Sequence, residues 1–433
     1  MTPDNLINAA LVGIDFGKTD FEASLEELSL LASSAGARPA VTLTGRRASP
    51  DAKMFIGSGK AEELRLACDA HNVEIVIFNH ALAPAQQRNL EQALNRRVVD
   101  RTSLILDIFA QRARTKEGKL QVELAQLQYN LPRLGGQGLV LSRLGGGIGT
   151  RGPGETKLEV DRRRIYARIH DLESQIDAVQ KNRHLHRRRR KLSRIPLVAL
   201  VGYTNAGKST LLNRLTGSEV FAEDKLFATL DPTTRHLILP EKQEILLTDT
   251  VGFIQKLPHT LVKAFRATLE EVQEADLLLH VVDCSNENYE QQIESVVEVL
   301  KELDAVSKPT LYVFNKADRL KATGTETDER AGEGLTPAQE AMMLHGREGI
   351  CVSAQTGANL DELQQLIERF FSEQQVRMEL LIPFAKGRLL TELHDLHAVR
   401  ETDYTEAGTR VKVSLPASKR ARFEPYEVHP DNE

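Results

Sequence analysis

One short stretch of the chain combines glycine, lysine and serine at a spacing suited to holding phosphates. It is residues 202–209, with the sequence Gly202-Tyr203-Thr204-Asn205-Ala206-Gly207-Lys208-Ser209. Glycines let successive backbone N–H groups wrap around phosphates, and a following helix N-terminus adds favourable partial charge. Lys208 is expected to reach the β- and γ-phosphates, and Ser209 to ligate Mg²⁺. These residue types predict binding and cleavage of a nucleoside triphosphate.

This pattern is informative only when it lies between a strand and a helix. The apolar run at residues 196–201 predicts the strand, and residues 210–215 predict the helix. A plain glycine turn before a helix is the alternative interpretation, and the flanking elements disfavour it.

A second polar segment follows the predicted strand at residues 245–248, and it consists of Asp249-Thr250-Val251-Gly252. We expect Asp249 to hold Mg²⁺, either directly or through a water molecule. The backbone N–H of Gly252 is expected to sense the γ-phosphate.

Two further segments predict which base is bound. They are Asn315-Lys316-Ala317-Asp318, after the predicted strand 311–314, and Ser353-Ala354-Gln355. Asp318 can accept hydrogen bonds from guanine N1–H and N2–H₂, a pairing that adenine cannot offer. Backbone N–H groups of the second segment are expected to face guanine O6. Each segment alone is a weak indication, but the four elements in this order predict GTP and not ATP.

The threonine that contacts Mg²⁺ and the γ-phosphate is expected within Phe227-Ala228-Thr229-Leu230-Asp231-Pro232-Thr233-Thr234. Thr229 is favoured, while Thr233 and Thr234 stay open, with turn chemistry around Pro232 as their alternative explanation. We therefore predict that residues 227–231 contact GTP. The predicted catalytic residues are Lys208, Thr229 and Gly252.

The residue after Gly252 is Phe253, where Ras-like GTPases carry a glutamine that orients the attacking water. A phenyl ring cannot do this, so slow intrinsic hydrolysis is predicted. Asn205 occupies the loop position at which potassium-activated GTPases carry an asparagine, which makes K⁺ a second candidate cofactor beside Mg²⁺. The alternative is that Phe253 only packs and Asn205 only caps the loop.

The elements that position these residues alternate between strand and helix. Apolar runs predict strands at residues 9–14, 40–43, 73–78 and 98–99, with helices between them. The chain as a whole is predicted to be α/β, with a P-loop GTPase domain, an N-terminal α/β domain, a helical coiled hairpin and a small C-terminal α/β domain. We expect the N-terminal α/β domain at residues 1–110 and the helical hairpin at 111–194. The GTP-binding domain is expected at 195–372, and the small C-terminal domain with its polar tail at 373–433.

The hairpin region differs from the rest in charge and in pattern. Residues 112–194 hold 20 Lys and Arg against 8 Asp and Glu, although the whole chain has a net charge of −5. Leucines recur at helical spacing from Leu120 to Leu131, and a second apolar seam runs from Leu158 to Val179. Between them, residues 135–154 contain nine glycines and two arginines but no acid. Such charge asymmetry indicates an anionic partner.

The segment at residues 144–159 resembles the signature of HflX-type GTPases, within the translation-factor-like P-loop GTPases. The resemblance extends over essentially the whole chain. It implies a bacterial GTPase that binds the large ribosomal subunit and splits or rescues stalled or idle ribosomes, notably under heat stress. It also implies that the hairpin loop lies near the peptidyl-transferase centre. Because Phe253 cannot orient the attacking water, we expect hydrolysis to rise when the large subunit or the whole ribosome orders the switches and supplies or positions the missing group. The candidate rRNA-binding residues are Arg143, Arg151, Arg187, Arg188, Arg189, Arg190 and Lys191.

Other interpretations stay open at this point. The basic run at residues 187–191 is also typical of a solvated linker. Gly57-Ser58-Gly59-Lys60 lacks phosphate-loop spacing and indicates a tight turn into a helix, yet a second nucleotide, ATP, is the competing interpretation. An ATP-driven RNA-remodelling enzyme and a regulatory GTP switch for a protein partner are the alternative function classes.

Three widely spaced cysteines, Cys68, Cys284 and Cys351, disfavour a disulfide framework or a thiolate metal site and fit a reducing compartment. The first residues lack a basic segment followed by an apolar core, and no apolar run is long enough to span a bilayer. We therefore expect a cytoplasmic monomer, with peripheral association with ribosomes or a membrane left open.

Overall fold

A computed structural model describes most of the chain, namely residues 7–17, 21–136, 157–193, 195–218, 226–255, 266–320, 344–373, 375–395, 398–416 and 419–428. The glycine-rich segment with Arg143 and Arg151 lies outside the described residues. Residues 187–191 belong to a described helix, but their side chains are not described.

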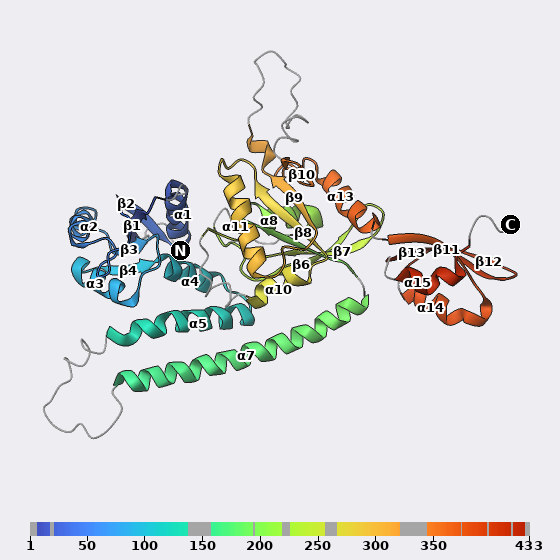
Figure 1. The fold of residues 1–433 in the computed structure, drawn as a ribbon, viewed down its shortest axis with the longest axis horizontal. Coiled ribbons are helices and arrows are strands. Elements are labelled where there is room, and N and C mark those ends of the chain that lie inside the picture. The colour runs from blue at the N-terminus through green and yellow to red at the C-terminus, as the bar shows by residue number, and fades with distance from the viewer. Residues whose placement is uncertain are drawn as a thin grey trace, which may run out of the picture.

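The N-terminal part forms a four-stranded parallel sheet in the order β2-β1-β3-β4, as the alternating pattern predicts (Figure 1). Its central strands are buried on both faces, which explains their unbroken apolar runs. The elements are β1 (Ile7–Asp15), α1 (Phe21–Ser34), β2 (Ala37–Arg46), α2 (Ser58–Ala70), β3 (Ile75–Phe78), α3 (Pro84–Leu94) and β4 (Arg97–Asp100).

Three helices and a short 3₁₀ turn lead on from this sheet: α4 (Arg101–Arg112), α5 (Lys116–Asn130), η1 (Leu131–Gly136) and α7 (Lys157–Ser193). Helices α5 and α7 lie side by side and form the predicted hairpin (Figure 1). Leu120 of α5 is buried against Leu172 and Ile176 of α7, and Arg168 pairs with Glu123 across the helices. The leucine spacing therefore marks the contact between the two helices.

The third part is a six-stranded sheet in the order β10-β9-β8-β5-β7-β6, parallel except for the edge strand β6. This is the predicted P-loop GTPase architecture. Its strands are β5 (Leu197–Gly202), β6 (Thr233–Ile238), β7 (Glu244–Asp249), β8 (Leu277–Asp283), β9 (Thr310–Asn315) and β10 (Gly349–Cys351). Its helical elements are α8 (Lys208–Thr216), α10 (Arg266–Glu274), α11 (Tyr289–Glu302), η2 (Ala317–Arg319) and α13 (Leu360–Glu373).

The C-terminal part is a three-stranded antiparallel sheet in the order β11-β13-β12, covered by helices on one side (Figure 1). It comprises β11 (Gln375–Ile382), η3 (Phe384–Lys386), α14 (Gly387–Asp395), β12 (Val399–Thr405), β13 (Gly408–Pro416), α15 (Arg420–Phe423) and η5 (Glu424–Tyr426). The sequence predicts a short helix and a strand near 411–415 here. It does not predict β12, because that strand is mostly exposed and polar.

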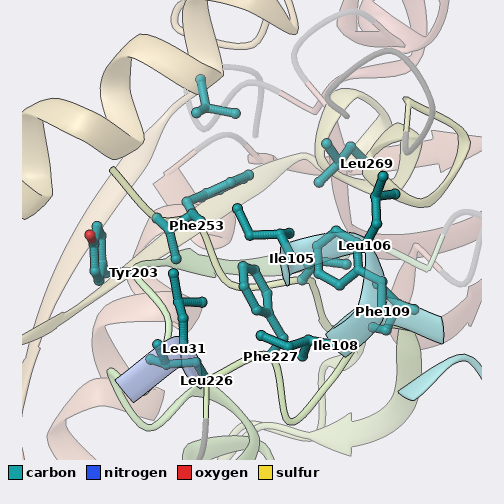
Figure 2. Packing of buried hydrophobic residues seen from close by; sticks show 14 of the residues in the cluster. Leu31, Ile105, Leu106, Ile108, Phe109, Tyr203, Leu226, Phe227, Phe253 and Leu269 are labelled. Atoms are coloured by element: carbon teal, nitrogen blue, oxygen red, sulfur yellow. The ribbon is translucent and has the colours of Figure 1, made fainter. Parts of the chain in front are cut away.

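A continuous apolar cluster joins the N-terminal sheet and helix α4 to the GTPase domain (Figure 2). From the N-terminal side it receives Leu31, Ile105 and Phe109, and from the GTPase side Phe227 and Phe253. The rings of Phe109 and Phe227 meet edge to face with their centroids 4.6 Å apart. We call this cluster the interdomain core. It fixes the N-terminal region against the segments that precede and follow the predicted Mg²⁺ ligands.

Replacing Phe109 with alanine is expected to lower the free energy of unfolding by about 3–5 kcal/mol, because the ring is buried and would leave a cavity. Leu30, exposed on α1, provides the matched control, since Leu30→Ala removes little buried surface. Denaturant unfolding followed by circular dichroism measures both variants. Equal unfolding midpoints for the two variants would contradict this description of the interdomain core.

Candidate functional site

The predicted phosphate loop, residues 202–209, runs from the end of β5 into helix α8. Two of its glycines are required by their surroundings. A Cβ at Gly202 would lie 2.2 Å from the Val281 carbonyl oxygen, and one at Gly207 would lie 2.2 Å from Asn315 Nδ2. Both also have positive φ, of 151° and 92°. The loop backbone is therefore curved in a way that a residue with a side chain at position 202 or 207 would not permit.

Lys208 is buried at the start of α8, and its ammonium group donates to the carbonyl oxygens of Gly202 and Tyr203 at 3.1 and 2.7 Å. Burial lowers the pKa of Lys208 to about 8, although the nearby Asp249 carboxylate acts in the opposite direction. The lysine therefore lies inside the loop, where a phosphate would add negative charge beside it.

Three oxygen-bearing side chains converge next to this loop. Ser209 Oγ donates to Asp249 Oδ2 at 2.5 Å and lies 2.8 Å from Thr229 Oγ1. The other carboxylate oxygen, Asp249 Oδ1, is buried without a hydrogen-bond partner among the described residues. Burial raises the pKa of Asp249, while Lys208 and the Ser209 hydroxyl lower it. Such a set of oxygens suits a hard divalent cation.

The geometry separates the three candidate threonines. Thr229 lines the pocket together with Lys208 and Ser209. Thr233 and Thr234 instead begin the edge strand β6, where the Thr234 hydroxyl donates to Thr248 Oγ1 at 3.1 Å. Thr229 is therefore the threonine that lies beside the proposed metal ligands.

The residues predicted to bind the base lie together at the ends of β9 and β10. Asn315 Nδ2 donates to the Ala206 carbonyl at 2.9 Å, and Asn315 Oδ1 accepts from the Ala354 N–H at 2.9 Å. Ser353 Oγ donates to Asp318 Oδ1 at 2.5 Å. These bonds join the phosphate loop to both base segments and orient the Asp318 carboxylate.

Several residues predicted to contact GTP make side-chain contacts elsewhere in the protein. In the switch segment, residues 226–231, Phe227 and Leu230 are buried in the interdomain core. Asp231 bonds to the start of helix α5. The side chains of Leu230 and Asp231 are therefore held outside the pocket, whereas Phe227 and Ala228 line it.

A buried polar network connects the phosphate loop to the N-terminal region, and the sequence does not predict it. The Tyr203 hydroxyl and the Arg101 guanidinium both donate to the Glu27 carboxylate. The Tyr203 hydroxyl accepts from the Gln255 N–H at 2.8 Å, and Arg101 donates to the Gln255 carbonyl at 3.1 Å. Burial, with the Glu27 charge, raises the pKa of Tyr203 well above its usual value. This network holds the segment after Gly252, which also pairs with the loop through Phe253.

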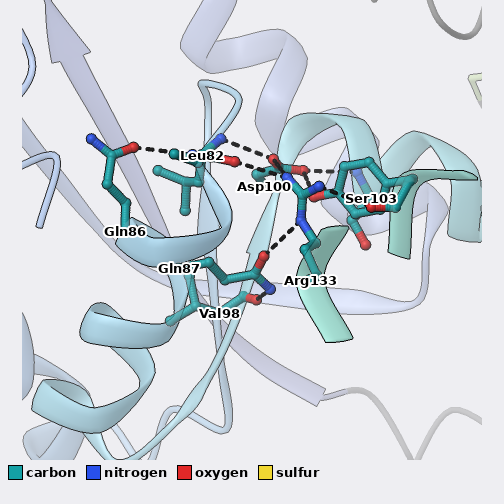
Figure 3. A network of polar contacts seen from close by, with 9 residues as sticks. Leu82, Gln86, Gln87, Val98, Asp100, Ser103 and Arg133 are labelled. Atoms are coloured by element: carbon teal, nitrogen blue, oxygen red, sulfur yellow. Dashed lines mark hydrogen bonds and ion pairs between the residues drawn. The ribbon is translucent and has the colours of Figure 1, made fainter. Parts of the chain in front are cut away.

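A second network fixes the hairpin to the N-terminal sheet (Figure 3). Asp100 Oδ1 accepts from the Ser103 N–H at 2.9 Å and from the Tyr129 hydroxyl at 2.7 Å, and Oδ2 accepts from the Leu82 N–H at 2.9 Å. Arg133, just after α5, donates to the Leu82 carbonyl at 2.8 Å and lies over the Tyr129 ring. The C-terminal end of α5 is thus anchored to the N-terminal sheet.

Gly57, with φ 80°, is the N-cap residue of α2, and the next three residues of the segment already form the first turn of that helix instead of a turn before it. The Lys60 ammonium donates to Glu63 Oε1 at 3.0 Å on the same helix. Among the described residues, no helix is long and apolar enough to cross a membrane.

Comparison with known proteins places each part of the chain. Three family descriptions match in succession: "GTP-binding GTPase N-terminal" over residues 22–110, "GTP-binding GTPase Middle Region" over 112–190, and "50S ribosome-binding GTPase" over 197–316. A GTP-binding protein of Sulfolobus solfataricus, solved in complex with GDP, is 25% identical and aligns with 85% of this chain and 99% of its own, with a TM-score of 0.45.

Relatives named GTPase HflX are more similar in sequence. GTPase HflX of Caldanaerobacter subterraneus is 49% identical over 416 residues, which cover 96% of this chain and 92% of the relative. GTPase HflX of Escherichia coli is 45% identical over 409 residues, which cover 94% of this chain and 93% of the relative. With this identity over nearly its whole length, the chain belongs to the HflX family of GTPases.

Proposed function

We propose that this GTPase acts on the large ribosomal subunit, hydrolysing GTP at the pocket beside residues 202–209. The observation that carries the proposal is the convergence of Ser209, Thr229 and Asp249 beside the phosphate loop. The family match over residues 197–316, described as a 50S ribosome-binding GTPase, supports the ribosomal partner. The positive charge of residues 112–194 supports contact with its rRNA.

We propose Ser209 and Thr229 as the Mg²⁺ ligands, with Asp249 held beside them either as a direct ligand or through a water. Asp249 Oδ1, which has no hydrogen-bond partner in the described part of the chain, and the two hydroxyls fit a cation that prefers oxygen. Ser209 and Thr229 would hold Mg²⁺ through their hydroxyl oxygens, and the ion would supply positive charge beside the phosphates. Lys208 supplies further positive charge, and the Gly252 N–H is the proposed γ-phosphate contact.

Base selection is proposed to rest on Asp318. Its carboxylate is held by the Ser353 hydroxyl at 2.5 Å, and Asn315 ties this part of the site to the phosphate loop. The carboxylate can then accept two hydrogen bonds from guanine, which disfavours the ATP-driven alternative.

Splitting or rescue of ribosomes under heat stress is the role that we propose for this activity. The hairpin is the proposed rRNA-contacting part, since its far end, where α5 stops and α7 begins, projects away from the GTPase sheet (Figure 1). Arg143, Arg151 and the basic run at residues 187–191 are the proposed contacts.

Deleting residues 135–154 is expected to reduce co-sedimentation with large subunits about tenfold or more. The deletion removes Arg143 and Arg151, which are the arginines of the glycine-rich segment proposed to contact rRNA phosphates. The affinity for GDP should stay within about twofold of the intact chain. Binding of the intact chain should also weaken steeply between low and moderate salt, because Lys and Arg contacts release counterions. If the deletion abolished nucleotide binding and left co-sedimentation intact, the hairpin would not be the ribosome-binding part.

A further inference from the structure

The Asp231 side chain lies on the N-terminus of a helix more than 100 positions earlier in the chain. Asp231 Oδ2 accepts from the backbone N–H groups of Arg114 and Thr115 at 2.8 and 2.9 Å, and Oδ1 accepts from the Thr115 hydroxyl at 2.5 Å. Backbone N–H groups before and within the first turn of a helix have no intrahelical partner, and the helix dipole favours a negative charge there. The switch segment thus holds Thr115, the N-cap residue of α5, whose hydroxyl in turn accepts from the Gly118 N–H at 2.9 Å.

The glycine beneath this carboxylate is a second, independent sign of the contact. Gly118 lies in the first turn of α5, where glycine is less favourable than alanine. A Cβ at Gly118 would lie 2.4 Å from Asp231 Oδ1. The absence of a side chain at position 118 therefore makes room for the Asp231 carboxylate.

Helix α5 does not move independently of its surroundings. Its C-terminal end is held to the N-terminal sheet through Tyr129 and Arg133, as described above. Along its length, Leu120 packs on α7. A displacement of the hairpin would therefore be transmitted along α5 to Thr115 and Asp231.

The path from Asp231 to the pocket is short and packed. Thr229 precedes Asp231 by two residues, and its hydroxyl lies 2.8 Å from Ser209 Oγ. The intervening Leu230 is 2% exposed, and Phe227 is fixed by Phe109. A backbone held at both Phe227 and Asp231 leaves the Thr229 side chain little freedom to leave the pocket.

We propose that Asp231 is a positioning residue, which holds Thr229 at the Mg²⁺ site and ties that position to the hairpin. The inference rests on the proposed roles of Thr229 and the hairpin. In this proposal the Asp231 side chain binds the start of α5 and does not contact the nucleotide.

Two variants of the full chain test this inference. Asp231→Asn removes the negative charge that accepts from two backbone N–H groups beside the helix N-terminus, and Gly118→Ala displaces the carboxylate without changing it. Asp276→Asn is the matched control, since Asp276 caps the Leu197 N–H at 2.8 Å at the opposite end of strand β5. The measurements are affinities for fluorescent GDP and for a non-hydrolysable GTP analogue with Mg²⁺, kcat and KM for GTP, thermal midpoints, and hydrogen exchange of residues 226–231 without nucleotide.

We expect Asp231→Asn and Gly118→Ala each to lower analogue affinity and kcat by about tenfold, with GDP affinity within about twofold of the unaltered chain. Hydrogen exchange of residues 226–231 should accelerate in both. In Gly118→Ala the helix propensity of alanine offsets part of the lost contact, so its thermal midpoint should stay well above the assay temperature and its loss of activity would not be a loss of folding. The double variant should lose no more analogue affinity and kcat than either single variant, since both substitutions remove the same contact.

Unchanged analogue affinity and kcat in both variants would overturn the inference, as would an equal loss of GDP and analogue affinity. These readouts need no ribosomes. A chain that failed to co-sediment with large subunits would therefore refute the proposed partner, while the analogue-to-GDP ratio would still decide the role of Asp231.

Discussion

Replacing Asp318 with asparagine is expected to weaken GTP binding about 100-fold, which corresponds to about 3 kcal/mol. The carboxylate accepts from two guanine donors, and an asparagine amide would turn its own donor toward one of them. Xanthosine triphosphate carries an oxygen at C2, so its affinity should rise relative to that of GTP. Competition of both nucleotides against a fluorescent GDP measures the change.

Two further variants delimit this prediction. Ser353→Ala removes the hydroxyl that donates to Asp318 Oδ1, so it should weaken GTP binding about tenfold without favouring xanthine. Asp276→Asn alters a carboxylate far from the base segments and should leave nucleotide preference unchanged. An Asp318→Asn protein that still preferred GTP as strongly as the unaltered chain would refute the assignment.

The parts of the site that the sequence predicts are those encoded locally. The phosphate loop, Asp249 and Asn315 each follow an apolar strand directly, and the parallel sheet brings the ends of these strands together. The central N-terminal strands β1 and β3 are likewise visible as apolar runs, because both of their faces are buried.

The contacts between distant segments leave no such pattern. Glu27 and Tyr203 are 176 positions apart, and Asp231 and Thr115 are 116 apart. Within its own helix Glu27 resembles any charged residue on a helix surface, yet it is buried beneath the phosphate loop. Strand β6 was not predicted either, because it is an edge strand with exposed positions and only Leu237 fully buried. Packing between domains determines the Glu27 and Asp231 contacts, and pairing with β7 determines β6.

Large ribosomal subunits are expected to raise GTP turnover on the order of 100-fold, which is about the effect of one preorganised polar group. The reason is the residue after Gly252. Phe253 is 1% exposed, and its ring packs in the interdomain core (Figure 2). A buried phenyl ring cannot orient the attacking water, so the chain alone should hydrolyse GTP slowly. We propose that the ribosome orders the switch segment and supplies or positions the missing group.

Potassium is proposed as a second contributor at the same step. Asn205 lines the pocket between Thr204 and the rest of the phosphate loop, with a φ of 62°. A K⁺ ion held there would add positive charge beside the phosphates in the transition state, as an arginine finger does in other GTPases. Faster turnover in KCl than in NaCl at equal ionic strength is the expected result, and equal rates would remove this contribution alone.

The measurement that tests the account most directly is steady-state release of phosphate from GTP by the full chain, with and without purified large ribosomal subunits. A Lys208→Ala protein in parallel reports any turnover that does not come from this pocket, and it should show almost none. The account predicts slow release by the chain alone and an increase on the order of 100-fold with large subunits. Equal release with and without subunits, from a chain whose pocket binds GTP, would contradict it.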